Sequence, residues 1–114
     1  MATTQDQLKQ QSCVPCQGNM EPLQGPELQK CVQKLTQGWK LIEDHHLEKT
    51  FHFPDFVQAL DFVNSVGALA ESENHHPDIT LTYCKVTLAL WTHKIRGLHE
   101  NDFILAAKID SLVP

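Results

Sequence analysis

Apolar and polar residues alternate along the chain with two different periods. Between residues 56 and 70 the apolar side chains recur every three or four positions, which predicts an amphipathic helix with one buried face. This stripe consists of Phe56, Ala59, Leu60, Val63, Val66, Gly67 and Ala70. A shorter stripe predicts an earlier helix that begins at Pro26, since proline suits the first helical turn, and ends before Gly38. Its apolar positions are Leu28, Cys31, Val32 and Leu35.

A period of two predicts short strands in the rest of the chain. The first two span residues 39–43 and 47–53, and the turn between them consists of Asp44, His45 and His46. Pro54-Asp55 ends the second of these strands and starts the central helix. One face of that strand is predicted to be apolar and to carry Leu47, Phe51 and Phe53.

Two further strands are predicted at residues 79–83 and 86–91, where apolar residues again alternate with threonines and other residues. A two-residue turn at 84–85 joins them, although it lacks the glycine or Asn-Gly pair that such turns usually contain. Continued outward, this register brings His76 opposite His93. Histidines that are distant in sequence are therefore predicted to meet at one end of a sheet.

A last helix is predicted over residues 100–112, with His99 at its N-cap and a hydrophobic staple between Leu98 and Phe103. Asp102 has two possible roles: a capping-box carboxylate, or a carboxylate that orients a histidine. The element order is thus a helix, then strand–strand–helix twice. This order predicts an α+β fold in which helices pack on one face of an antiparallel four-stranded sheet.

Composition indicates a single domain preceded by an arm. The chain has 114 residues, of which 41% are hydrophobic, and this suits one modest core. Residues 1–24 are polar and rich in glutamine, so we expect a loosely ordered arm before a domain of residues 25–114. The arm contains Cys13-Val-Pro-Cys16, the spacing of half a zinc ribbon or of a redox pair. No second such pair exists in the sequence, so a reduced pair with a minor structural role is the favoured interpretation.

Charge and hydropathy exclude several classes of function. The formal charge is −5 and Arg96 is the only arginine, so no basic stripe is present to bind a nucleic-acid backbone. No stretch approaches the roughly 20 apolar residues that cross a bilayer, which argues against a membrane partner. Residues 1–12 contain no apolar signal region, and a cytoplasmic location is therefore expected.

The candidate chemistry lies in His75-His76-Pro77, His93 and Asp102. Imidazole has an unperturbed pKa of about 6.5, so it exchanges protons near neutral pH. Three histidines in one pocket suit either proton transfer or a metal site. Adjacent histidines tend to point apart in an extended chain, and the His-Glu-x-x-His motif is absent, so proton transfer is favoured over metal binding. The remaining histidines are expected to be surface residues: His45, His46, His52 and His99.

Glu71-x-x-x-His75-His76-Pro77, followed by Tyr83, His93 and Asp102, resembles the pterin-4a-carbinolamine dehydratases. The resemblance spans roughly residues 25–112. It implies a small α+β protein that forms homodimers or homotetramers and needs no metal or organic cofactor. The implied reaction is dehydration of a 4a-hydroxytetrahydropterin to the quinonoid dihydropterin. This reaction recycles the pterin of the aromatic amino-acid hydroxylases, a functional link that the resemblance also implies.

The resemblance also implies roles for individual residues. His75 and His93 transfer protons, His76 orients the pterin, and Asp102 completes the catalytic set. The substrate site is predicted to be lined by Asn74, His75, His76, Trp91, Thr92, His93 and Lys94. The chain departs from the family pattern at Asn74, Ile79, His99 and Asn101. The departures at Asn74, Ile79 and Asn101 bear on the preferred pterin side chain more than on the reaction. At His99 the family more usually has Thr or Ser, so the last helix is expected to be capped less firmly.

Two other functions stay open from the sequence. One is a non-catalytic module that binds a protein, because some members of the resembled family act as a dimerisation cofactor for a transcription factor. The other is a metal hydrolase that uses the three histidines as ligands.

Overall fold

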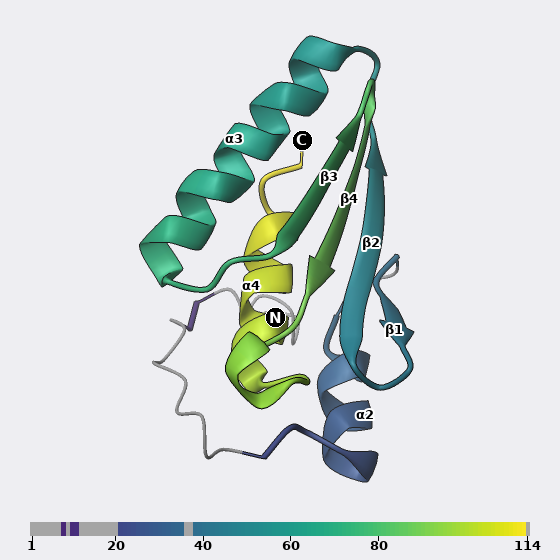
Figure 1. Cartoon of the computed structure of the whole chain (residues 1–114), viewed down its shortest axis with the longest axis vertical. Helices are drawn as coiled ribbons and strands as arrows, with labels where there is room; N and C mark the ends of the chain where they lie inside the picture. The colour runs from purple at the N-terminus through teal and green to yellow at the C-terminus, as the bar shows by residue number, and fades with distance from the viewer. Residues whose placement is uncertain (1–7, 9, 12–20, 36–37, 114) are drawn as a thin grey trace.

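The computed structural model describes residues 8, 10, 11, 21–35 and 38–113. Within these residues, three helices pack against a four-stranded antiparallel sheet with strand order β1-β2-β4-β3 (Figure 1). The predicted α+β fold and its element order are confirmed. The cysteine motif of the arm lies outside the described residues, and the boundary between arm and domain stays a prediction. The elements are α2 (Gly25–Gln33), β1 (Lys40–Ile42), β2 (His46–His52), α3 (Phe56–Glu73), β3 (Asp78–Thr82), β4 (Lys85–Leu90), the short 3₁₀ helix η1 (His93–Ile95) and α4 (Glu100–Asp110).

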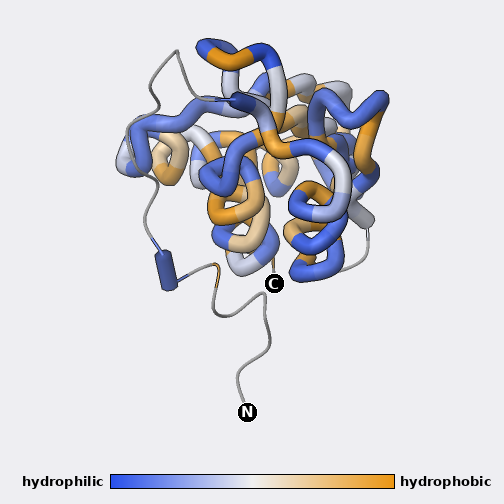
Figure 2. The backbone as a smooth tube through the Cα atoms, turned by 90° about the horizontal axis from the view of Figure 1, so that it is seen from below, coloured by the Kyte–Doolittle hydropathy of each residue, from blue (hydrophilic) through white to orange (hydrophobic). Residues whose placement is uncertain are grey.

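The sheet has one apolar and one polar face, as the period of two predicts. Its outer face carries threonines, and the side-chain oxygens of Thr50 and Thr87 are 3.0 Å apart across β2 and β4. In the end-on view of Figure 2, apolar and polar residues alternate along the backbone instead of forming separate blocks. Burial of a leucine side chain contributes roughly 1.5–3 kcal/mol, so the inner face is a main source of stability. That face contributes Leu47, Phe51, Val86, Leu88 and Leu90 to the core.

Helix α4 is buried on nearly all sides, and it lies behind the sheet in contact with both α3 and α2 (Figure 1). A helix in this position is expected to be apolar all round. The residues of the predicted staple, Leu98 and Phe103, are both fully buried. His99 is the N-cap as predicted, and its Nδ1 accepts a hydrogen bond of 3.1 Å from the Asn101 N–H. The other buried residues of α4 are Asn101, Asp102, Ile104, Leu105, Ala106, Ala107 and Ile109.

The turn between β3 and β4 lies one residue earlier than predicted. Thr82 pairs with Lys85, so Tyr83 and Cys84 form the turn, and Tyr83 takes a left-handed conformation with φ of 45°. The register therefore differs from the predicted one by two residues. Pairing of the two strands ends at Asp78 opposite Ala89, so the predicted opposition of His76 and His93 across the sheet is wrong.

The turn between β1 and β2 also lies one residue earlier in the chain than predicted. It comprises Glu43, Asp44 and His45, because His46 already belongs to β2 and pairs with Ile42. Glu43 and Asp44 have φ values of 52° and 55°, and the His45 N–H donates to the Ile42 carbonyl at 2.9 Å. This tight turn determines where the His45 ring lies.

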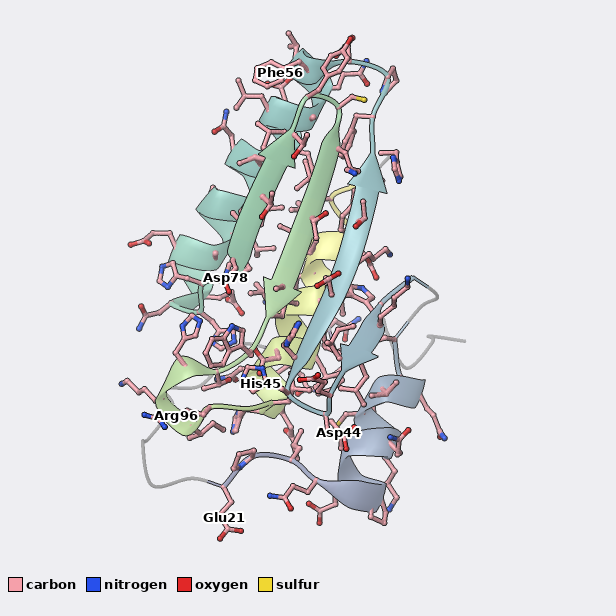
Figure 3. The ribbon with its side chains drawn as sticks, turned by 45° about the vertical axis from the view of Figure 1, so that its right-hand side comes forward. Glu21, Asp44, His45, Phe56, Asp78 and Arg96 are labelled. Atoms are coloured by element: carbon pink, nitrogen blue, oxygen red, sulfur yellow. The ribbon has the colours of Figure 1, made fainter. Side chains whose placement is uncertain are left out.

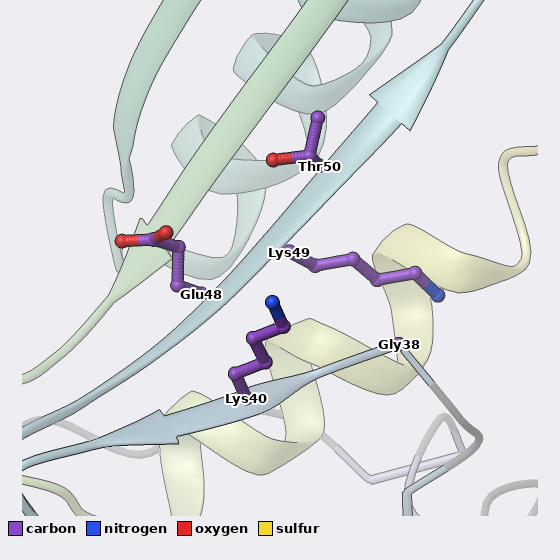
Figure 4. Close-up of a pocket in the computed structure, with 5 residues that line it drawn as sticks. All are labelled: Gly38, Lys40, Glu48, Lys49 and Thr50. Carbon is purple, nitrogen blue, oxygen red and sulfur yellow. The ribbon is translucent and has the colours of Figure 1, made fainter.

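Asp110 of α4 joins β1 and β2 to the helical layer. Its carboxylate accepts hydrogen bonds from the Trp39 indole at 2.9 Å and from the Lys49 ammonium at 2.8 Å. Figure 4 shows Lys49 extending from β2 toward α4. The cavity drawn there has a volume of about 210 Å³, and no histidine lines it. The histidines of the predicted site therefore lie outside this cavity.

Candidate active site

The C-terminus of α3 determines where His75 and His76 leave the helix. The Asn74 N–H donates to the Glu71 carbonyl at 3.2 Å, and the His75 N–H donates to the Ala70 carbonyl at 3.1 Å. Asn74 has φ of 51°, so these bonds form a Schellman motif with asparagine in the left-handed position. Asparagine tolerates that conformation better than most residues. The motif stops the helix and directs the chain into the His75-His76-Pro77 segment.

Asp102 is the buried centre of the candidate site. Its side chain has no exposed surface, and its Oδ1 lies 2.6 Å from Nε2 of His75, which is itself 11% exposed. Oδ2 accepts hydrogen bonds from the Thr92 hydroxyl at 2.8 Å and from the His99 N–H at 2.9 Å. The capping-box interpretation of Asp102 is therefore confirmed, and the same carboxylate contacts a histidine.

This arrangement favours one tautomer of His75. A carboxylate only accepts hydrogen bonds, so Nε2 of His75 carries the proton when Asp102 is ionised. The nitrogen through which His75 then exchanges a proton is Nδ1. A histidine whose tautomer is set by a buried carboxylate suits acid–base chemistry.

A closed loop presents His93. Thr92 and Gly97 pair across the loop, and the Thr92 N–H donates to the Gly97 carbonyl at 2.8 Å, with η1 between them. A Cβ atom at Gly97 would lie 2.6 Å from Cβ of Pro22, so glycine is needed for this close approach of residues 21–24. The side chain of His93 remains 53% exposed. Because Thr92 binds Asp102, the loop that carries His93 is attached to the same carboxylate as His75.

A second group of rings surrounds His93. Its ring is 4.1 Å from the Trp91 ring, centroid to centroid, in an edge-on arrangement, and the His45 ring lies 4.5 Å from the Trp91 ring. The Trp91 indole donates to Oδ2 of Asp78 at 3.2 Å. Oδ1 of Asp78 is 3.9 Å from Nε2 of His93. Asp78 follows directly after Pro77, so the two histidine segments meet although the predicted register is wrong.

His76 is the most exposed of the three predicted histidines. Its side chain is 55% exposed, and Nε2 lies 2.8 Å from Oε2 of Glu71 on the last turns of α3. Five residues separate Glu71 from His76, so their contact depends on the Schellman motif that ends α3 between them. His76 can therefore contact a ligand at the surface while Glu71 restrains its ring.

Figure 3 shows His45, Asp78 and Arg96 at the same end of the sheet. The prediction that His45 is a plain surface residue is wrong, because its ring is half-buried against Trp91. Asp78 was not predicted as a site residue, although its position next to Pro77 at the start of a strand was the available signal. Asn74 and Lys94 are exposed.

Metal and thiol chemistry receive no support from the described residues. Across that part of the chain, no group of three His, Cys, Asp or Glu side chains is placed to hold a metal ion. Cys84 lies in the turn at the far end of β3 and β4. Burial raises the pKa of the Cys31 thiol in α2, which disfavours its reactive thiolate form. In the same residues, no helix is long and apolar enough to cross a membrane.

Residues 21–112 match the model of a protein family described as pterin 4 alpha carbinolamine dehydratase. The chain belongs to this family. The resemblance drawn from the histidine motif is thereby confirmed at the level of the family. A relative from Rubrobacter xylanophilus is 48% identical over 106 residues, which cover 93% of this chain and 98% of the relative. A relative from Alkaliphilus metalliredigens is 47% identical and covers 90% and 93% of the two chains. Both relatives are named provisionally as pterin-4-alpha-carbinolamine dehydratases.

Two solved structures share the carbinolamine dehydratase fold. A transcriptional coactivator/pterin dehydratase from Brucella melitensis is 27% identical, with a TM-score of 0.76 over 82% of this chain and all of that one. A pterin dehydratase-like RuBisCO assembly factor of the α-carboxysome is 26% identical, with a TM-score of 0.58 over 67% of this chain and 89% of that one. The family fold therefore occurs in proteins with more than one described role.

Proposed function

We propose that this protein dehydrates 4a-hydroxytetrahydropterins to quinonoid dihydropterins. The observation that supports this most is the position of Asp102, which contacts His75 directly and the loop of His93 through Thr92. Asp102 thus connects His75 with the loop that carries His93, and the two imidazoles can serve as the acid and the base of one site. Membership of the dehydratase family supplies the substrate class.

The reaction needs two proton transfers and no redox change. One histidine donates a proton to the C4a hydroxyl, and the C4a–O bond breaks to release water. The other accepts the proton of N5, whose electron pair forms the C4a=N5 double bond. His75 and His93 perform these steps, and either can be the acid because imidazole serves both roles near neutral pH. Positioned acid–base groups contribute about 10²–10⁴-fold to such reactions.

The surrounding residues bind and orient the pterin. His76, restrained by Glu71, contacts the substrate at the mouth of the site. Asn74 and residues 91–94 line it, and Trp91 supplies an aromatic surface for the flat pterin ring. The chemistry requires no metal or organic cofactor. The product is the substrate of a pterin reductase step, and the carbinolamine is supplied by aromatic amino-acid hydroxylation.

The test is the rate of carbinolamine loss followed by ultraviolet absorbance. We expect His75→Ala and His93→Ala to lower kcat about 10²-fold or more, because each removes a proton-transfer group. His52→Ala is the matched control, since His52 is an exposed histidine at the opposite end of β2. Retained activity in a chelator excludes the metal-hydrolase alternative. Equal rates for all three variants and the wild type would reject the proposed roles.

A non-catalytic role is the second candidate. It is favoured by the two solved relatives, which are described as a transcriptional coactivator/pterin dehydratase and as a RuBisCO assembly factor. A double variant with His75→Ala and His93→Ala distinguishes the two roles. Binding of a partner that is unchanged in this variant supports the interaction role, whereas wild-type turnover without a retained partner contradicts it.

A further inference from the structure

Asp78 faces two rings of the loop that follows β4. It is the first residue of β3, and its pairing with Ala89 of β4 fixes its backbone. One carboxylate oxygen accepts the Trp91 indole N–H at 3.2 Å, and the other lies 3.9 Å from Nε2 of His93. The two oxygens of Asp78 therefore lie next to the side chains of Trp91 and His93, which belong to one loop.

Three contacts hold Trp91. Asp78 accepts the indole N–H, and the indole ring contacts the His93 ring at 4.1 Å and the His45 ring at 4.5 Å, centroid to centroid. A ring fixed in this way restricts the positions open to the neighbouring imidazole. His93 itself is more than half exposed, so without such contacts its ring would sample several rotamers.

We propose that Asp78 is a positioning residue that orients His93, mainly through Trp91 and partly by its own charge. The arrangement parallels the contact of Asp102 with His75. It differs in that Asp78 is 62% exposed and too far from His93 for a hydrogen bond. The hydrogen bond to the indole is therefore the stronger of the two contacts. This inference rests on the proposed proton-transfer role of His93 and adds a residue to it.

Three variants separate the two contacts. Asp78→Ala removes both, and Asp78→Asn keeps an oxygen that accepts the indole N–H but removes the charge. Trp91→Phe keeps an aromatic ring beside His93 but removes the hydrogen bond. Thr80→Ala is the matched control, because Thr80 lies two residues along β3 on the same face and is also exposed.

In turnover, we expect Asp78→Ala and Trp91→Phe to lower kcat about fivefold with KM changed less than about twofold, because misplacement of an acid–base group affects the chemical step. Asp78→Asn should retain most of kcat, and Thr80→Ala all of it. Two outcomes would overturn the proposal. One is equal kcat in Asp78→Ala and Thr80→Ala. The other is a raised KM at unchanged kcat, which would mean that Asp78 binds the substrate directly.

A spectroscopic measurement without substrate keeps the two proposals distinguishable. In a Trp39→Phe background Trp91 is the sole tryptophan, and its indole N–H gives one proton resonance. We expect Asp78→Ala to move this resonance upfield and to change the His93 ring resonances, while Asp78→Asn and Thr80→Ala leave both near their original positions. Unchanged resonances in Asp78→Ala contradict the positioning role. If wild-type protein does not accelerate carbinolamine loss, the proposed function fails, and these resonances still decide whether Asp78 holds Trp91 and His93. Should Asp78→Ala not fold, the kcat of Trp91→Phe compared with that of Asp78→Asn replaces it: a lower value in Trp91→Phe is expected, and equal values would overturn the proposal.

Discussion

At the scale of single residues, the carboxylates determine what the histidines can do. Asp102 is fully buried and has three hydrogen-bonding partners, so its orientation is fixed. Glu71 and Asp78 are exposed partners of His76 and His93, and they restrain these rings less strongly. The site therefore combines one rigid imidazole, His75, with two that remain adjustable at the surface. This suits a site in which one proton-transfer group is fixed and others adapt to a ligand.

Asp102→Asn tests the tautomer of His75. The amide oxygen can keep the hydrogen bonds from Thr92 and His99, which turns the amide NH₂ toward Nε2 of His75. His75 then carries its proton on Nδ1, the wrong nitrogen for the proposed reaction. We expect kcat to fall about 10²-fold or more while the midpoint of urea unfolding changes little.

Asp102→Ala is the companion variant for this prediction. It also leaves the His99 N–H and the Thr92 hydroxyl without their acceptor, so the free energy of unfolding should fall by about 1–3 kcal/mol. A kcat for Asp102→Asn within threefold of the wild type would show that the tautomer of His75 does not matter.

At the scale of elements, the site is built where several of them end. Helix α3 ends at Glu73, two residues before His75, and α4 begins at Glu100 beside His99. Strand β3 begins at Asp78, at the level where β4 ends. The loop between β4 and α4 is closed by the pair of Thr92 and Gly97 and packs against Pro22. Ends of elements leave side chains free of regular pairing, and the rigid elements fix their positions.

Gly97→Ala tests the packing of this loop. The added methyl group would approach Pro22 to 2.6 Å, and the neighbouring hydrogen bond of 2.8 Å from the Leu23 N–H to the Leu98 carbonyl would be disturbed. We expect the free energy of unfolding, measured with urea, to fall by about 1–3 kcal/mol. Gly67→Ala is the control, because nothing lies within 4 Å of its added methyl group. In the middle of α3 that change should stabilise by up to about 1 kcal/mol, so effects of the same sign in both variants would contradict the packing described here.

The elements and the capping role of Asp102 could be predicted from the sequence, because both depend on local patterns. The stripe of α3 and the cap at His99 are short-range features. The register of β3 and β4 could not be predicted in the same way. A shift of two residues keeps every side chain on its original face, so Leu81 is directed to the core in either register. The turn decides between the registers, and Tyr83 in a left-handed conformation is an unusual turn residue.

The contact of His45 with Trp91 also could not be predicted from local sequence patterns. Its ring contact with Trp91 depends on the tight turn after β1 and on the course of the loop after β4. These segments are far apart in the sequence. Asp78 could be predicted only in part. Its place next to Pro77 can be read from the sequence, but its hydrogen bond to Trp91 cannot.

At the scale of the whole molecule, the candidate site and the exposed apolar side chains at the start of α3 lie at opposite ends. Figure 3 shows Phe56 at one end and His45 with Arg96 at the other. The exposed apolar side chains of α3 are Phe56, Val57 and Leu60, which are 44%, 65% and 38% exposed. A cluster of this kind is typical of an interaction surface. It supports the proposal that the protein forms homodimers or homotetramers.

Val57→Glu tests this proposal. A charge at the centre of an apolar contact is unfavourable, so we expect a lower molar mass by light scattering, with kcat within about twofold of the wild type because the site is remote. Gln29→Glu adds the same charge at an exposed position of α2 and should leave the molar mass unchanged. An unaltered mass in Val57→Glu would show that any self-association uses another surface.

The most direct test of the central claim is the decay of a freshly generated 4a-carbinolamine in the presence of purified wild-type protein, followed by ultraviolet absorbance. The account predicts decay that is faster than in buffer, proportional to protein concentration and reduced about 10²-fold or more in His75→Ala. Decay at the buffer rate with folded wild-type protein would contradict it.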